Sequence, residues 1–180
     1  MASEIIIKNR LKHIRPFSIT IICAVILALF LPIQNTRAQN NTQAAANFTL
    51  KSQLGENIKL SELRGKIVLL NFWAPRCGIC LHQFSLLEKL QQQNRKNDFA
   101  VISVDIGGNF KKFTATAKKH GTTFPMLFDS ENNVGALYSI STVPASILID
   151  RDGNIRSTVS ADDLKNSKKM QQIIQGLLNE

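Results

Sequence analysis

Apolar residues follow two different patterns along the chain from about residue 48 onward. The continuous apolar runs Ile67–Phe72 and Ala100–Val104 are typical of central strands that are covered on both faces. Apolar positions at helical spacing follow each run, and they predict helices over Cys80–Gln93 and Phe110–Gly121. The middle of the chain therefore predicts alternating strands and helices.

Shorter patterns predict a hairpin on either side of this region. Phe48–Leu50 and Ile58–Leu60 flank a turn that contains Gly55, which is typical of an N-terminal β-hairpin. Ala145–Ile149 and Asn154–Val159 flank the turn sequence DRDG and predict a second hairpin.

The remaining elements are a short insert and a last helix. Pro125–Phe128 predicts an extended piece, Asn133–Tyr138 a short helix, and the apolar stripe from Met170 to Leu178 an amphipathic C-terminal helix. This is the order of the thioredoxin fold, an α/β fold with a central mixed sheet flanked by helices. We expect a mostly parallel sheet with an antiparallel edge, and the insert should precede the strand that follows Pro144.

The N-terminus has the pattern of an export segment. The basic stretch Lys8–Arg15 precedes the apolar run Phe17–Leu31, and Thr36-Arg37-Ala38 places small residues where a signal peptidase cleaves. Residues 1–38 are therefore predicted to be a signal peptide or an N-terminal membrane anchor, with residues 17–33 in the membrane in the second case. The basic flank should stay in the cytoplasm.

Three segments follow from this pattern. Residues 39–47 are polar and predict a linker, and residues 48–180 are predicted to form one thioredoxin-like domain. The predicted location of this domain is periplasmic or extracytoplasmic.

Composition and charge narrow the possible partners. A hydrophobic content of 44% is typical of a globular protein. Part of the formal charge of +9 belongs to the N-terminal segment, and the other lysines are scattered instead of forming a stripe with aromatic residues. We therefore expect no nucleic-acid partner.

The candidate chemistry lies in the Cys77-Gly78-Ile79-Cys80 motif. Of the three cysteines, Cys23 lies in the N-terminal apolar run, so only this pair belongs to the folded part. A disulfide between them would close only a very small loop, so reactivity or metal binding explains the pair better than structural stapling. The motif falls where a strand turns into a helix, and the helix N-terminus together with Arg76 should lower the pKa of Cys77. Cys77 is then the attacking sulfur and Cys80 the thiol that releases the product.

Two further features belong to the predicted site. Trp73, four residues before Cys77, is expected to offer an apolar surface to a partner protein, or to pack in the core, or both. The sequence Thr142-Val143-Pro144 places a proline just before a buried strand, which indicates a special turn with a candidate cis peptide bond.

Other uses of the cysteines fit less well. Haem attachment requires a histidine directly after the second cysteine, where Leu81 stands. Structural zinc requires four ligands, and no second spaced pair accompanies the motif, so no metal is predicted. A Cu(I) carrier that uses the two thiolates and His82, and an interaction module with an incidental thiol pair, stay open as alternatives.

Several stretches together resemble the TlpA/ResA-like branch of the thioredoxin superfamily. They are Leu60–Lys66, Asn71–Ala74, Cys77–Cys80, Phe124–Pro125, Thr142–Pro144 and Leu148–Gly153. The resemblance implies that Cys77 is the nucleophile, Cys80 the resolving thiol, and Pro144 a cis-proline whose neighbour Val143 pairs with the substrate backbone. It also implies an exported thiol-disulfide oxidoreductase without a bound cofactor, which acts on exported protein thiols and disulfides and has a membrane redox partner.

The chain departs from this family near the motif. Arg76 stands where the family usually has Trp, Ile79 where it commonly has Pro, and Gln83 where members often carry Glu. Ser85 replaces a common helix-kinking proline, and Asn71 fits this branch where thioredoxin itself has Asp. Arg76 and Gln83 are therefore predicted to modulate the redox centre, and the direction of electron flow stays open.

Overall fold

A seven-stranded sheet organises residues 43–180, which are the part of the chain that this computed structural model describes. The strands are β1 (Thr49–Ser52), β2 (Asn57–Lys59), β3 (Ile67–Trp73), β4 (Phe99–Asp105), β5 (Met126–Phe128), β6 (Ala145–Ile149) and β7 (Ile155–Thr158). The helices are α3 (Gly78–Gln93), α4 (Phe110–His120), α5 (Asn133–Leu137), α6 (Ala161–Lys165) and α7 (Ser167–Leu178), with a 3-10 turn at Leu60–Leu63. The strand order is β2-β1-β5-β4-β3-β6-β7.

Strand β3 is the centre of the sheet, and every one of its residues is buried. Side chains alternate along a strand, so Ile67, Leu69 and Trp73 enter one hydrophobic cluster while Val68 and Phe72 enter the other. The prediction of a central strand covered on both faces is therefore confirmed, because β3 has a packed layer on each side.

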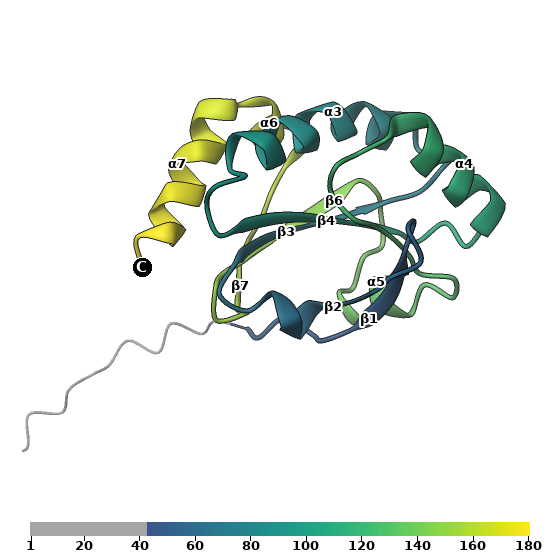
Figure 1. The fold of residues 1–180 in the computed structure, drawn as a ribbon, viewed down its shortest axis with the longest axis horizontal. Coiled ribbons are helices and arrows are strands. Elements are labelled where there is room, and N and C mark those ends of the chain that lie inside the picture. Colours follow the sequence, from purple (N-terminus) through teal and green to yellow (C-terminus); the bar gives the residue numbers. More distant parts are fainter. Residues whose placement is uncertain (1–42) are drawn as a thin grey trace, which may run out of the picture. The chain divides into compact units, whose positions relative to one another are not determined.

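The two layers are of unequal size (Figure 1). Helices α3, α4, α6 and α7 cover one face of the sheet, and α5 lies on the other face with the segment that leads into β1. The first cluster includes the buried face of α3, and the second includes Val134 of α5 and Phe48. Cys77 and Cys80 belong to the larger layer, which contains α3, α4, α6 and α7.

The predicted mixed sheet is confirmed, but the expectation that most of its strand pairs are parallel is wrong. Only β3–β4 and β4–β5 pair in parallel, whereas β1–β2, β1–β5, β3–β6 and β6–β7 are antiparallel. The sheet is mixed because both predicted hairpins join it, one at each edge. The predicted insert is confirmed as β5 and α5, and β5 is the strand that connects the N-terminal hairpin to the central strands.

The packed region begins before residue 48. Ala45 is buried, its N–H donates to the carbonyl of Gly153, and Ala44 forms a bridge with Asn154. The Tyr138 hydroxyl also donates to the carbonyl of Ala46 at 2.7 Å. Residues 43–47, predicted as part of a polar linker, therefore dock onto the second hairpin and onto Tyr138, which follows α5.

The export segment predicted for residues 1–38 lies outside the described residues. Within residues 43–180, no helix has the length and apolar character needed to cross a membrane.

Candidate active site

Cys77 caps the helix that follows the central strand. Strand β3 ends at Trp73, and α3 begins at Gly78. Cys77 keeps an extended backbone, with φ −89° and ψ 96°, and its sulfur accepts the N–H of Cys80 at 3.2 Å. The same N–H also donates to the Cys77 carbonyl oxygen at 3.1 Å, so the sulfur shares a donor of the first helical turn. The arrangement favours a negative charge on Cys77 in the reduced protein.

The two cysteines of the motif form a disulfide. The Cα atoms of Cys77 and Cys80 are 5.2 Å apart. Cys80 lies in the first turn of α3, is 1% exposed and belongs to the hydrophobic core, whereas Cys77 is only partly buried. Cys77 is therefore the more accessible cysteine of the pair.

A second segment reaches the disulfide from far along the chain. The Val143–Pro144 peptide bond is cis, which confirms the cis bond predicted from the sequence. The Val143 carbonyl oxygen lies 3.8 Å from the Cys77 sulfur. Strand β6 begins only at Ala145, and the Val143 N–H has no hydrogen-bond partner within residues 43–180. The backbone just before Pro144 is therefore available to pair with an extended polypeptide beside the disulfide.

Trp73 packs in the core and offers no surface to a partner. Its side chain is 0% exposed, and its ring meets that of Phe84 edge-on at 5.0 Å and that of Phe113 at 6.4 Å. Of the two roles predicted for Trp73, the structure therefore supports core packing and not partner contact. The exposed apolar side chain of the motif is Ile79, at 57%.

A buried row of polar side chains crosses the sheet. The Asn71 amide donates to Ser146 Oγ at 3.0 Å, and its oxygen accepts the Ser103 hydroxyl at 3.0 Å. These three residues are register partners on β6, β3 and β4, so they share one face of the sheet. The three side chains therefore hydrogen-bond to one another, and none of them is ionisable.

The two predicted modulating residues lie in different surroundings. Gln83 is 5% exposed, and its Oε1 has no hydrogen-bond partner within residues 43–180. Arg76 is exposed and lines a cavity of about 310 Å³ beside the motif. Gln83 therefore lies on the buried face of α3, whereas Arg76 lies on the surface that a partner would meet.

Sequence reasoning missed one buried carboxyl group at this end of the sheet, that of Asp105. It is the last residue of β4, directly opposite Trp73 in the parallel β3–β4 ladder. Burial raises the pKa of Asp105 to about 6; the N–H of Gly107 opposes this shift and the charge of Asp129 adds to it. The sequence did contain a signal for this residue. Asp105 directly follows the predicted buried strand Ala100–Val104, and parallel neighbouring strands end at the same edge of a sheet.

We expect Asp105→Asn to change the pH dependence of stability. The folded protein holds the Asp105 proton up to about pH 6, whereas the unfolded chain releases it near pH 3.8. Ionisation therefore costs the folded state stability as the pH rises through this window, and neutral Asn avoids that cost. The free energy of unfolding of the variant, relative to the wild type, should rise by about 2 kcal/mol between pH 4 and pH 8.

Urea unfolding at a series of pH values measures this difference. Asp98→Asn is the matched control, because the Asp98 side chain is exposed. An Asp105→Asn difference that stays constant with pH would show that Asp105 ionises normally in the folded protein.

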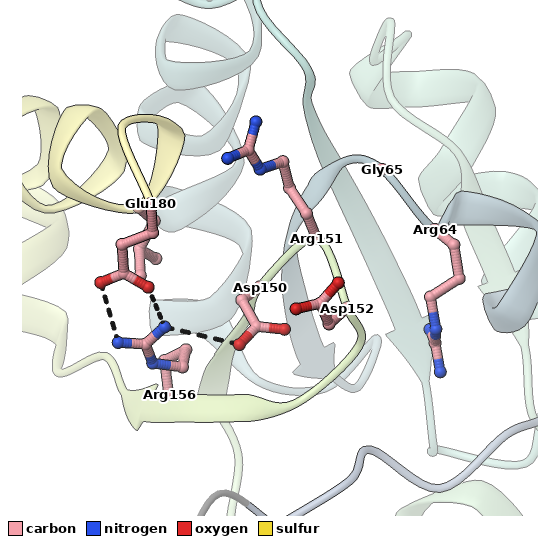
Figure 2. A pocket seen from close by; sticks show the side chains of 8 residues that line it. Arg64, Gly65, Asp150, Arg151, Asp152, Arg156 and Glu180 are labelled. Atoms are coloured by element: carbon pink, nitrogen blue, oxygen red, sulfur yellow. Dashed lines mark hydrogen bonds and ion pairs between the residues drawn. The ribbon is translucent and has the colours of Figure 1, made fainter. Parts of the chain in front are cut away.

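A larger hollow at the opposite end of β3 offers different chemistry (Figure 2). It has a volume of about 580 Å³ and lies around the turn of the second hairpin. Arg156 pairs with Glu180 and with Asp150, the latter at 3.5 Å, and this contact ties the end of α7 to the hairpin. The hollow is lined by charged groups of both signs and holds no cysteine, so the disulfide end of the molecule is the stronger candidate site.

No cluster of three potential metal ligands occurs within residues 43–180.

Comparison with known proteins identifies the family. A model of the AhpC/TSA family matches residues 42–158, which include the disulfide and the cis-proline segment. The chain belongs to the AhpC/TSA family. The predicted resemblance to thioredoxin-like proteins is thereby confirmed at the family level.

Similar proteins carry names from thiol-disulfide chemistry. Thiol-disulfide oxidoreductase ResA of Geobacillus thermodenitrificans is 30% identical over 128 residues, which cover 67% of this chain and 72% of that protein. ResA of Bacillus subtilis is 29% identical over 116 residues, and this chain spans 65% of its length. A crystal structure from Chlorobium tepidum, described as a thiol:disulfide interchange protein DsbE, matches with a TM-score of 0.69 and 26% identity over 76% of this chain and 96% of that one. The thioredoxin-like fold is confirmed by this match.

Proposed function

We propose that this AhpC/TSA family member is an exported thiol-disulfide oxidoreductase that exchanges disulfides with protein partners through Cys77 and Cys80. The observation that carries the proposal is the disulfide between a partly exposed, helix-capping Cys77 and a buried Cys80, beside the unpaired backbone of Val143. The names of the similar proteins support the same chemistry.

The exchange proceeds in two displacements. The Cys77 thiolate attacks one sulfur of a partner disulfide, a mixed disulfide forms, and one partner thiolate leaves. Cys80 then loses its proton and attacks the Cys77 sulfur, which releases the second partner thiolate and forms the Cys77–Cys80 disulfide. Two electrons pass from the cysteine pair to the partner, and the same steps in reverse oxidise a dithiol partner.

The surroundings of the disulfide support this order of attack. The helix N-terminus and the N–H of Cys80 stabilise a thiolate at Cys77. The fully buried Cys80 is shielded from a second partner molecule, so its reaction is directed to the neighbouring Cys77 sulfur. The free N–H of Val143 would pair with the partner backbone and hold its disulfide in place.

We expect the pKa of the Cys77 thiol to lie below that of a free thiol. The physical cause is the N-terminus of α3, with a smaller contribution from the exposed Arg76 because solvent screens its charge. Thiolate absorbance of the reduced protein against pH measures this value. Arg76→Gln should raise the pKa of Cys77 slightly, and a wild-type pKa at or above that of a free thiol would contradict the explanation.

Catalysis is tested with the full chain and a disulfide-bonded test protein in the presence of dithiothreitol. Cys23 is first replaced by Ser, so that only the motif cysteines react. This background should accelerate reduction of the test protein over dithiothreitol alone, and the additional Cys77→Ser/Cys80→Ser variant should not. Equal rates with and without the motif cysteines would overturn the proposed function.

Export is part of the proposal and rests on the basic stretch Lys8–Arg15 with the apolar run that follows it. A membrane redox partner would then renew the cysteine pair after each turnover. Alkylation of thiols in intact cells tests the direction. A mostly reduced pair would indicate a reductant supplied with electrons, and a mostly oxidised pair would indicate an oxidant.

A further inference from the structure

A cavity of about 310 Å³ lies directly beside the redox disulfide. One wall is the loop Ala74–Arg76, which leads into Cys77. The other wall is formed by Gly107–Asn109 and by Lys112 in the first turn of α4. A Cβ atom at Gly107 would lie 2.8 Å from Pro75 Cδ, so the two walls meet closely at the base of the cavity. The hollow therefore adjoins the loop that leads into Cys77.

The charge of the cavity has one sign. Arg76 and Lys112 are the charged residues that line it, and both are exposed. Neither makes an ion pair with a carboxylate of residues 43–180. The carboxyl group behind the wall, that of Asp105, is fully buried and accepts the Gly107 N–H at 2.7 Å, so a partner in the cavity does not meet it.

The first turn of α4 leaves Lys112 free for a partner. Asn109 caps this helix, and its side chain accepts the Lys112 backbone N–H at 2.9 Å. The backbone group is therefore satisfied within the protein, while the exposed Lys112 residue lines the cavity.

We propose that Arg76 and Lys112 are specificity-determining residues that favour partner disulfides with an acidic side chain close to the cysteine. This inference rests on the proposed function and adds a substrate class to it. Arg76 and Lys112 have no ion-pair partner within residues 43–180 and line a hollow next to the loop that leads into Cys77. Two such cations attract a carboxylate and repel a cation, and they act mainly on the rate of encounter. The neutral row at Asn71 and the buried Cys80 contribute nothing to this choice.

The test uses three peptides that each contain one intramolecular disulfide and differ at one position beside the first cysteine, which is Glu, Gln or Lys. The reduced full chain in the Cys23→Ser background is mixed with each peptide, and the rate constant of the first turnover is measured by acid quench. At low ionic strength the Glu peptide should react about threefold faster than the Gln peptide and the Lys peptide about threefold slower, with both differences shrinking at high salt.

Charge reversal at Lys112 makes the test decisive. Lys112→Glu should abolish or reverse the order of the three peptides. Lys119→Glu is the matched control, because it alters the net charge equally from the last turn of the same helix. Equal wild-type rates for all three peptides would overturn the inference, and so would an equal change of their order by Lys119→Glu.

Failure of the inference differs from failure of the proposed function. If Lys112→Glu slows all three peptides by the same factor, the lysine acts on the chemistry of Cys77 and does not select partners. If no peptide is reduced by the wild type, the proposed exchange reaction itself fails.

Discussion

Replacing Cys77 by Ser should lower the rate of disulfide exchange by about a thousandfold or more. A serine hydroxyl fits the same helix-capping position, so the fold and the cap are retained, but a hydroxyl is not ionised near neutral pH and does not attack a disulfide. The remaining Cys80 thiol is 1% exposed, so a protein partner does not reach it. Loss of a nucleophile commonly costs an enzyme several powers of ten in rate.

The measurement is the initial rate of reduction of a disulfide-bonded protein, with Cys23→Ser as the background for both chains. Far-ultraviolet circular dichroism shows whether the variant keeps its fold. A Cys77→Ser variant with a tenth or more of the background rate would show that another group carries the attack.

Replacing Cys80 by Ser should stop the reaction halfway. Cys77 is still capped by the N–H of residue 80, because this contact uses the backbone, so the first displacement proceeds. The resolving thiol is absent, so the mixed disulfide between Cys77 and the partner accumulates instead of being released. We expect most of the variant to be found as a covalent complex with an oxidised partner within the time of one wild-type turnover.

Non-reducing electrophoresis detects the complex, and peptide mapping should place the link at Cys77. The Cys77→Ser/Cys80→Ser variant is the control and should form none. A link found mainly at another site of the variant, or no covalent complex at all, would contradict the assigned order of attack.

Local patterns were sufficient to predict the main elements and the redox pair. The continuous apolar run of β3, the helical spacing after Cys80 and the turn of the second hairpin each depend on neighbours in the sequence. The cysteine spacing likewise fixes a local geometry, since residues three apart meet in one helical turn. These features were predicted because the physics that determines them acts over a few residues.

Long-range pairing accounts for what the sequence did not reveal. The N-terminal hairpin joins the sheet because β1 pairs with β5, which lies some 75 residues later, and no local pattern specifies that contact. The docking of Ala45 depends in the same way on the distant turn at Gly153. The helices α6 and Leu60–Leu63 are too short for their spacing to stand out.

The surroundings of the candidate site show the same limit. Trp73 was a candidate for either surface or core, and its burial depends on Phe84 and Phe113 from two helices. Asp105 and Lys112 come beside the motif only through the parallel pairing of β4 with β3. The register of these two strands, more than any motif, determines what surrounds the disulfide.

A single-turnover experiment tests the exchange reaction most directly. The reduced full chain in the Cys23→Ser background is mixed with an equal amount of a protein that contains one disulfide, quenched with acid, and both products are analysed by mass spectrometry. We predict that each disulfide reduced in the partner is matched by one Cys77–Cys80 disulfide formed in the chain. Partner thiols that appear while Cys77 and Cys80 stay reduced, or a partner disulfide that stays intact, would contradict the proposed function.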